Sequence, residues 1–146
     1  MIYLDTSYLA KFYLKEPGTE DVLKAFAKES NFVCGEHGRL ELMALFKRHQ
    51  REGRLSATQV RLLWEKHGQD LADGLVRFLP LSSGLIAAAC QQVLALPPSV
   101  FVRAADALHL ACAADAGLKE IYSHDRHLLA AAPHFGLKGL DVIKAV

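Results

Sequence analysis

Four carboxylate side chains stand in apolar stretches of this 146-residue sequence. Asp5 directly follows the short apolar run of residues 1–4, and Asp125 follows a second such run at 120–123. Asp106 lies among Ala and Leu residues, and Glu41 lies between two leucines. Burying an unpaired carboxylate costs several kcal/mol, so these four acids are expected to face a cavity or a cation. Most of the remaining acids, Asp70 and Asp141 included, are expected on the solvated surface.

Four carboxylates that meet in one place repel one another and raise one another's pKa. A divalent cation relieves this repulsion. The set offers oxygen ligands without Cys or paired His, which favours Mg²⁺ or Mn²⁺ over Zn²⁺. Such an ion binds phosphate oxygens and activates water for attack on phosphorus. The residues therefore predict metal-dependent hydrolysis of a phosphate ester.

Simpler roles exist for some of these residues. Asp5 and Asp125 each precede a predicted helix, and a helix N-cap needs a single Asp without any partner. Asp5 taken alone fits a cap about as well as a catalytic group. His109 lies three residues after Asp106 on the same helical face, so it is a satisfied core histidine, a partner of Asp106 or a contact to substrate.

Strand and helix patterns alternate along the chain and predict how these acids are positioned. Apolar strand patterns occur at 1–4, 31–34, 75–81, 120–123 and 138–143, the third and last near an edge. Helical patterns occur at 6–14, 19–28, 40–51, 57–73, 83–95, 103–116 and 126–132, with a break at 35–38. Thr19 and Ser56 are expected N-caps. The alternation predicts an α/β fold with a mostly parallel sheet, whose ligands bind at the carboxyl ends of strands.

The overall composition sets limits on the class of protein. The length fits one domain, and a net charge of +1 argues against a strongly basic nucleic-acid binder. Cys34, Cys90 and Cys112 form no CxxC pair and lie in apolar runs, which predicts reduced, buried thiols in a cytosolic protein. The sequence contains neither a signal-peptide pattern nor a membrane-spanning apolar stretch, so a cytoplasmic location without membrane contact is expected.

Four sequence blocks, in order, resemble those of PIN-domain ribonucleases, in particular the VapC-type toxins of type II toxin–antitoxin pairs. The blocks are YLDTSYLAKFY, GRLELMALFKR, RAADALHLACA and IYSHDRHLLAAA, the last followed by FGLKGLDV. They contain Asp5, Glu41, Asp106 and Asp125 respectively. The resemblance runs the length of the chain and implies a single PIN domain over residues 1–146.

The resemblance implies a PIN-like three-layer α/β/α sandwich and an endoribonuclease that needs Mg²⁺ or Mn²⁺. It also implies an RNA substrate, a homodimer and a cognate antitoxin protein as partner. The implied catalytic residues are Asp5, Glu41, Asp106 and Asp125, of which Asp5, Asp106 and Asp125 bind metal. Thr6 and Ser123 resemble hydroxyl groups that orient the acids, and His109 is a supporting residue. His127 stands where many relatives carry a further acid, which leaves open the number of ions and whether Asp125 binds metal directly.

In the implied mechanism Asp5 and Asp106 hold the ion with help from Asp125, and Glu41 holds a second ion or acts on the attacking water. Candidates for gripping the RNA backbone are Arg39, Lys47, Arg48, Arg103 and Arg126, with Arg103 foremost. Two other functions fit the pattern less well. One is a non-catalytic binding module with an acidic pocket. The other is a phosphatase-type α/β hydrolase that uses Asp5, although this class needs a second acid where Ser7 stands.

Overall fold

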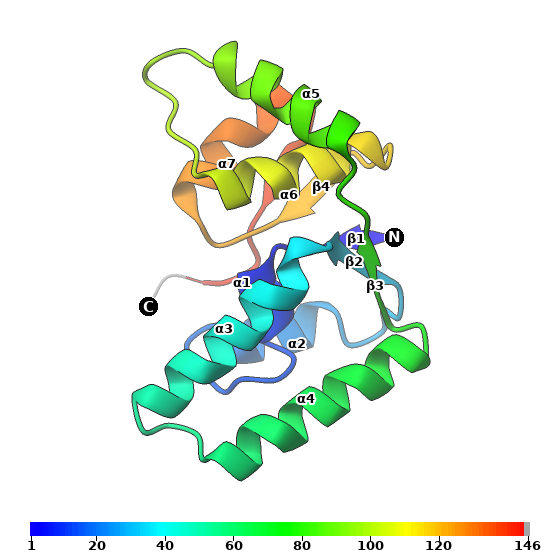
Figure 1. Ribbon diagram of the computed structural model, residues 1–146, viewed down its shortest axis with the longest axis vertical. Helices are drawn as coiled ribbons and strands as arrows, with labels where there is room; N and C mark the ends of the chain where they lie inside the picture. Colours follow the sequence, from blue (N-terminus) through cyan, green and yellow to red (C-terminus); the bar gives the residue numbers. More distant parts are fainter. Residues whose placement is uncertain (145–146) are drawn as a thin grey trace.

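A computed structural model describes residues 1–144, in which a parallel sheet lies between two groups of helices (Figure 1). The strands are β1 (Ile2–Tyr3), β2 (Phe32–Gly35), β3 (Val76–Leu79), β4 (Glu120–Tyr122) and β5 (Lys138–Leu140). All the paired strands are parallel, and a bridge between Leu4 and Tyr122 joins the β1–β2–β3 sheet to the β4–β5 pair. The resulting strand order is β3-β2-β1-β4-β5.

The helices form two layers on opposite faces of these strands (Figure 1). They are α1 (Thr6–Ala10), α2 (Thr19–Ala25), α3 (His37–Arg51), α4 (Ala57–Ala72), α5 (Ser83–Leu94), α6 (Ala104–Asp115), α7 (Arg126–Ala131) and the 3₁₀ helix η1 (Ala132–Phe135). Helices α1 to α4 pack in one hydrophobic core, and α5 to η1 pack in the other. The predicted three-layer α/β/α arrangement is therefore confirmed.

The central strands serve both cores because successive strand side chains point to opposite faces of a sheet. Tyr3 and Val33 point toward the core of α5, α6 and α7. Leu4, Phe32 and Cys34 point toward the core of α1 to α4. These strands are therefore buried on both faces, as expected for parallel sheets covered by helices.

Two features of the first loop differ from the prediction. The helix after Asp5 ends at Ala10, because Lys11, Phe12 and Tyr13 donate their backbone N–H groups three residues back and tighten the chain into turns. Thr19 is not an N-cap. Gly18, with φ of +92°, is the N-cap of α2, and the Thr19 hydroxyl instead donates to the Leu14 carbonyl at 2.8 Å.

Helix α3 begins three residues earlier than predicted, at His37. Gly38, which was expected in a break, lies within the helix and is buried. A Cβ atom at Gly38 would lie 2.6 Å from Cys34 Sγ and 3.2 Å from Thr6 Oγ1, so the glycine lets this helix approach β2 and α1 closely. The predicted cap of α4 is confirmed, since Ser56 accepts from Gln59 N in a full capping box.

The edges of the sheet agree with the sequence, with shorter strands. β3 is an edge strand, and β5 ends at Leu140 instead of Ile143. Beyond β5 the chain leaves the sheet and is held by Tyr8, whose hydroxyl donates to Asp141 Oδ1 at 2.5 Å and accepts from Val142 N at 2.7 Å.

Some burial predictions are wrong. Cys90 is exposed on α5, whereas Cys34 and Cys112 are buried thiols. Asp70 is buried, and hydrogen bonds from the Tyr13 hydroxyl and the Lys66 ammonium group compensate for the burial of its charge.

Among residues 1–144, no helix combines the length and apolar character that crossing a membrane requires.

Candidate active site

The strand order reverses between β1 and β4, because chain connections run outward from this pair in opposite directions. Such a reversal opens a crevice at the carboxyl ends of the two strands, where α/β proteins bind their ligands. Asp5 follows β1 at this point, and Ser123 follows β4. The Ser123 hydroxyl donates to Asp5 Oδ2 at 2.5 Å, which places the two strand ends in direct contact.

The structure brings all four acids to one cleft of about 480 Å³. Asp5 and Asp125 come from the strand ends, Glu41 from α3 and Asp106 from the first turn of α6. Asp5 and Asp125, the first and last of the four, lie 120 residues apart in the sequence. The cleft thus assembles the predicted acid set from both helical layers. The catalytic role of each acid stays a prediction.

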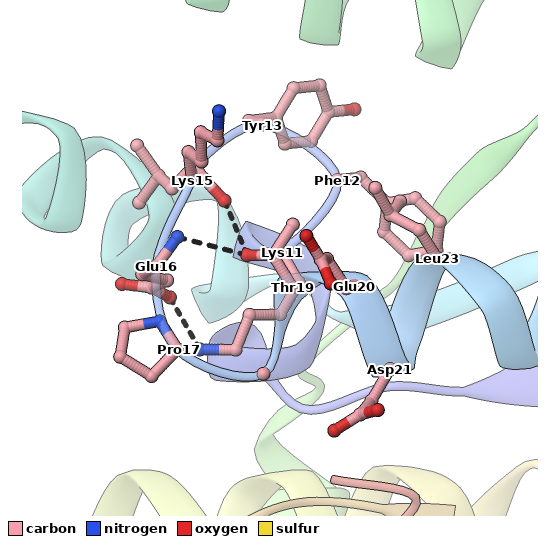
Figure 2. A pocket seen from close by; sticks show the side chains of 12 residues that line it. Lys11, Phe12, Tyr13, Lys15, Glu16, Pro17, Thr19, Glu20, Asp21 and Leu23 are labelled. Carbon is pink, nitrogen blue, oxygen red and sulfur yellow. Dashed lines mark hydrogen bonds and ion pairs between the residues drawn. The ribbon is translucent and has the colours of Figure 1, made fainter.

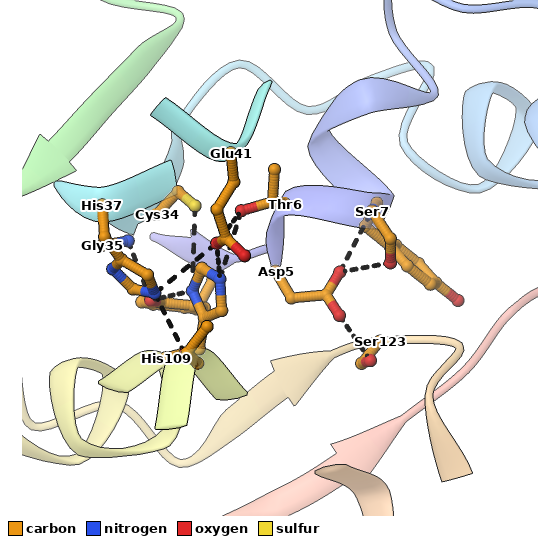
Figure 3. A network of polar contacts seen from close by, with 12 residues as sticks. Asp5, Thr6, Ser7, Cys34, Gly35, His37, Glu41, His109 and Ser123 are labelled. Carbon is orange, nitrogen blue, oxygen red and sulfur yellow. Dashed lines mark hydrogen bonds and ion pairs between the residues drawn. The ribbon is translucent and has the colours of Figure 1, made fainter. Parts of the chain in front are cut away.

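Asp5 is both a helix cap and a cleft residue (Figure 3). Its Oδ1 accepts hydrogen bonds from Tyr8 N at 2.9 Å and from the Ser7 hydroxyl at 2.8 Å, while Oδ2 accepts from Ser123. Burial raises the pKa of Asp5, and these hydrogen bonds and nearby His109 only partly offset that increase. The cap and site roles that the sequence left as alternatives therefore coexist.

Asp125 uses its two oxygens differently. Oδ1 caps α7 by accepting from His127 N at 2.8 Å and Leu128 N at 3.0 Å, and Oδ2 lies 3.4 Å from the exposed Arg103 guanidinium. The half-buried side chain of Asp106 makes no hydrogen bond or ion pair within residues 1–144. Burial, followed by the charge of Asp125, raises the pKa of Asp106 to about 6, and Asp5 and Glu41 add to the effect.

Glu41 is held through one oxygen (Figure 3). Its Oε1 accepts from the Thr6 hydroxyl at 2.8 Å and lies 2.9 Å from His109 Nε2. Burial alone would raise the pKa of Glu41, but the contacts with His109 and Thr6 outweigh it and lower that pKa. Glu41 Oε2 has no hydrogen-bond partner in the part of the chain that the structure describes, so it can accept from a ligand.

One interpretation of the sequence made His109 a partner of Asp106. Within residues 1–144, the two side chains form no hydrogen bond or ion pair, so this interpretation is wrong. His109 is fully buried and contacts Glu41 through Nε2, while the Tyr3 hydroxyl lies 2.8 Å from its Nδ1. Burial alone would lower the pKa of His109, but its contacts with Cys34 and Glu41 raise it. A positively charged His109 next to Glu41 is therefore favoured, and it holds this carboxylate in its ionised form.

The donor chemistry of the cleft fits a hard divalent cation. The free oxygens belong to carboxylates, and the Asp106 carboxylate has no protein partner within residues 1–144. Burial, and after it repulsion by Asp125, raises the pKa of Asp106. An ion at this position would remove that repulsion, and Mg²⁺ and Mn²⁺ are the ions that an oxygen-only set suits. The group formed by Asp5, Asp106 and Asp125 is therefore compatible with the predicted ligand set.

Of the five basic residues proposed for RNA binding, Arg48 and Arg103 line the cleft, from α3 and from the N-cap of α6. The other three, Arg39, Lys47 and Arg126, do not line it, and Arg39 pairs with Glu36 at 2.9 Å. Arg51, from the last turn of α3, lines the cleft as well. Sequence reasoning did not include Arg51, although its i,i+3 spacing from Arg48 places both on one helical face.

A larger hollow of about 740 Å³ lies away from the four acids, over the loop between α1 and α2 (Figure 2). Two of its polar contacts are internal, because Lys11 Nζ lies 2.6 Å from Glu16 Oε1 and the Thr19 hydroxyl donates to the Leu14 carbonyl. The acid cleft gathers four carboxylates from distant parts of the chain, so it is the better candidate for chemistry.

Two further residues belong to the surroundings of the site and were missed from sequence. His37 Nε2 lies 3.6 Å from Glu41 Oε1, and Tyr3 supports His109 from β1. His37 and Glu41 are four residues apart. A predicted helix that began at residue 37 would have placed both on one helical face. Tyr3 carries no such signal, because its partner lies 106 residues away in the chain.

Known proteins resemble this chain in sequence pattern and in fold. The sequence model of the PIN domain matches residues 2–133. FitAcB from Neisseria gonorrhoeae superposes with a TM-score of 0.73 at 19% identity, covering 97% of this chain and 98% of that chain. VapC20 from Mycobacterium tuberculosis gives 0.70 at 17% identity, with coverage of 90% and 95%. FitAB bound to an IR36 DNA fragment gives 0.68 at 16% identity, with coverage of 100% and 98%.

No protein with a curated description matches the sequence. The low identities of the solved structures mean that their likeness concerns the fold. The family model, by contrast, matches far more than half of the chain and includes the segments that carry all four acids of the cleft. On this evidence, the protein belongs to the PIN-domain family.

Proposed function

We propose that this protein is a Mg²⁺- or Mn²⁺-dependent endoribonuclease and the toxin of a toxin–antitoxin pair, with residues 1–146 forming a single PIN domain. The observation that carries the proposal is the convergence of Asp5, Glu41, Asp106 and Asp125 on one cleft at the reversal of strand order. An acid cluster of this kind suits metal-assisted attack on a phosphodiester. PIN-family membership supports a nuclease activity.

The structural neighbours support the choice of substrate and partner. VapC20 is described as a toxin that cleaves the sarcin–ricin loop, which supports RNA as the substrate class here. The FitAB structures support a toxin–antitoxin assembly, so we propose a cognate antitoxin protein as partner. We also propose that the protein acts as a homodimer in the cytoplasm.

In the proposed mechanism Asp5, Asp106 and Asp125 hold the divalent ion, which when bound supplies Lewis-acid polarisation of a phosphate oxygen and activation of water. Ser123 and the Tyr8 amide fix the direction of the Asp5 carboxylate. Thr6 and His109 hold Glu41 Oε1, which leaves Oε2 free to accept a proton or hydrogen bond from the attacking water. Such fixed orientation keeps the acceptor within reach of its proton.

We propose that the arginines lining the cleft bind the RNA backbone. Arg103 is the N-cap residue of α6, and Arg48 and Arg51 come from α3. Their pairings are weak, since Arg48 Nε lies 3.5 Å from Glu52 and Arg103 lies 3.4 Å from Asp125, with all these side chains partly exposed. A guanidinium group that is weakly paired and partly exposed can leave its carboxylate and bind a phosphate in bidentate geometry.

The decisive experiment replaces Asp5 with Asn and measures Mg²⁺-dependent cleavage of cellular RNA. Asn caps helices as well as Asp does, so Tyr8 N keeps its acceptor while the charge is lost. We expect the cleavage rate to fall more than about 100-fold, because a metal ligand is lost and loss of an outer partner alone costs about 10–100-fold. The circular dichroism spectrum should stay unchanged. EDTA should abolish cleavage by the wild type.

The matched control is Asp115→Asn, an exposed acid on α6 that makes no hydrogen bond within residues 1–144. It should cleave at the wild-type rate. Equal cleavage by Asp5→Asn and wild type would overturn the mechanism. Absence of any metal-dependent cleavage by the wild type, across transfer, ribosomal and messenger RNA, would favour the non-catalytic binding module instead.

A further inference from the structure

A second set of metal-ligating atoms lies directly beside the acid cleft (Figure 3). His37 Nε2, Glu41 Oε1 and His109 Nε2 all lie within 4.8 Å of one another. His37 and Glu41 come from the first turns of α3, and His109 comes from the facing surface of α6. The set differs from the acid cleft in its chemistry, because two of its three ligands are imidazoles.

We propose that His37, Glu41 and His109 form a binding site for a transition-metal ion such as Zn²⁺, which shares Glu41 with the acid cleft. Imidazole nitrogens suit Zn²⁺, Ni²⁺ and Cu²⁺, whereas Mg²⁺ prefers oxygen ligands. Two His and one carboxylate are a ligand set that proteins use for Zn²⁺, with the fourth position left to water. The proposal therefore adds a site of different metal selectivity.

The distances require little rearrangement. Ligands of Zn²⁺ lie about 2.0–2.2 Å from the ion and therefore lie at most about 4 Å from one another. Glu41 Oε1 already lies 3.6 Å from His37 Nε2 and 2.9 Å from His109 Nε2. The two imidazole rings have centroids 4.1 Å apart and are tilted by 41° to one another, and both Nε2 atoms lie near the same carboxylate oxygen.

The surroundings hold the His109 imidazole in place and leave space for the His37 imidazole. The Tyr3 hydroxyl lies 2.8 Å from His109 Nδ1 and accepts from Gly35 N at 2.8 Å, so His109 directs Nε2 toward Glu41. Metal-ligating imidazoles commonly have such an outer partner on their second nitrogen. Gly35 makes room for the other ring, because a Cβ there would lie 2.7 Å from His37 Cε1.

Binding would change three contacts. His37 Nε2 would give up its contact with the Ala105 carbonyl at 3.0 Å. His109 Nε2 would release the proton that faces Glu41 Oε1 at 2.9 Å and Thr6 Oγ1 at 3.2 Å. Two of the three ligands, Glu41 and His109, line the cleft. An ion can therefore enter from the cleft.

The shared carboxylate couples the two sites. With Zn²⁺ bound to Glu41 Oε1, the negative charge of this acid would be compensated, which would weaken Oε2 as an acceptor for the attacking water. Zn²⁺ is then expected to inhibit Mg²⁺-dependent cleavage, a consequence that rests on the proposed nuclease function. The binding of Zn²⁺ itself does not depend on that function and is measured without RNA.

The test titrates EDTA-treated, dialysed protein with ZnCl₂ by isothermal calorimetry at pH 7.5, with Co²⁺ visible absorption as a second probe. We expect one site, with at least tenfold weaker binding in His37→Gln. The matched control is His134→Gln, which removes an exposed histidine and should bind as the wild type does. Asp106→Asn removes an acid of the cleft and leaves the three ligands, so it should retain Zn²⁺ binding.

Two results would overturn the proposal. The first is absence of Zn²⁺ binding by the wild type at 100 μM metal, or equal binding by His37→Gln. The second is loss of Zn²⁺ binding in Asp106→Asn with retention in His37→Gln, which would assign the ion to the acid cleft. If Zn²⁺ binds as expected but cleavage is absent in every protein, the proposed function fails and the metal site stands. If cleavage occurs, the fold-inhibition by Zn²⁺ should be smaller in His37→Gln than in wild type.

Discussion

At the scale of single residues, the four acids of the cleft differ in how many of their oxygens the protein already occupies. Asp5 has both oxygens in hydrogen bonds, Glu41 and Asp125 have one held firmly, and Asp106 has neither within residues 1–144. Hydrogen bonds to these oxygens fix orientation, and because each carboxylate oxygen has two lone pairs, an oxygen with a single partner, such as Asp5 Oδ2, can still bind a ligand. The hydroxyl of Thr6 matters for this reason, since it holds Glu41 from the first residue of α1.

Thr6→Val is predicted to loosen Glu41 without changing side-chain volume. Thr6 is buried, and a hydrogen bond to a charged group contributes about 1.5–3 kcal/mol, so the free energy of unfolding should fall by that order. RNA cleavage should fall about tenfold or more, as for other residues that orient ligands. Thr6→Ser keeps the hydroxyl and should restore most of the cleavage. Equal kcat values for the Val and Ser variants would contradict this role.

At the scale of elements, close contacts between α3, β2 and α1 decide where Glu41 stands. Gly38 packs against Cys34 and Thr6, which lets the first turns of α3 lie against the strand ends. Glycine inside a helix is otherwise unfavourable relative to alanine by roughly 0.5–1 kcal/mol. Its presence in α3 is therefore explained by packing, and not by helix propensity.

Gly38→Ala is predicted to destabilise the protein, whereas Gly68→Ala should stabilise it. A Cβ at Gly38 would approach Cys34 Sγ to 2.6 Å, and overpacking of this kind costs about 1–3 kcal/mol. Gly68 lies in the middle of α4 with no atom within 4 Å of the corresponding Cβ position, so alanine should add about 0.5–1 kcal/mol. Urea denaturation of both variants measures the difference. Stabilisation by Gly38→Ala would show that α3 can shift freely.

The chain after β5 is held to α1 by Asp141, and this contact predicts a pH dependence. Burial alone would raise the pKa of Asp141, but hydrogen bonds with Tyr8, His124 and the Ile143 amide lower it. An acid whose pKa is lower in the folded state stabilises the fold above its unfolded pKa, about 3.9. This stabilisation is lost as the pH falls through the folded pKa.

Asp141→Asn should therefore lower the free energy of unfolding by about 1 kcal/mol at pH 7, and the difference from wild type should shrink below about pH 4. Denaturant titrations at pH 7 and at pH 3.5 measure it. Asp115→Asn, in the exposed part of α6, serves as control and should track the wild type at both pH values. A difference that grows on acidification would reverse the assigned sign.

At the scale of the whole molecule, the parallel sheet concentrates negative charge at one end. Two strand ends and two helices meet there and keep carboxylates close together, and the pKa of Asp106 is raised by burial and by the charge of Asp125. Proteins often retain such strain where a ligand relieves it. Ligand binding to the folded state alone raises stability by mass action.

Mg²⁺ is accordingly predicted to raise the melting temperature. At a concentration one hundred times its Kd, an ion adds about 2.7 kcal/mol, which corresponds to about 5–10 °C for a chain of this size. Asp106→Asn should melt at a higher temperature than wild type in EDTA, because repulsion is removed, and should lose most of the Mg²⁺ response. Asp115→Asn should respond as wild type does. An undiminished Mg²⁺ response in Asp106→Asn would exclude this acid as a ligand.

Local patterns in the sequence were sufficient to predict the fold class and the acids of the cleft. A strand that ends in Asp before a helix is a short-range pattern, and Asp5 and Asp125 both follow it. Ser56 was recognisable as a cap because a cap needs only neighbours three residues away. Asp106 stood out because its neighbours in the same helix are apolar.

Contacts between distant residues were not predictable in the same way. Asp70 is buried by Tyr13, 57 residues earlier, and His109 pairs with Glu41, 68 residues earlier, instead of with nearby Asp106. Helix periodicity says which face a residue occupies, but only the packing of α3 against α6 decides which side chains meet across the gap. The sequence alone thus determined a parallel α/β domain with an acidic site, and the tertiary structure decided which partners hold each acid and brought His37 beside them.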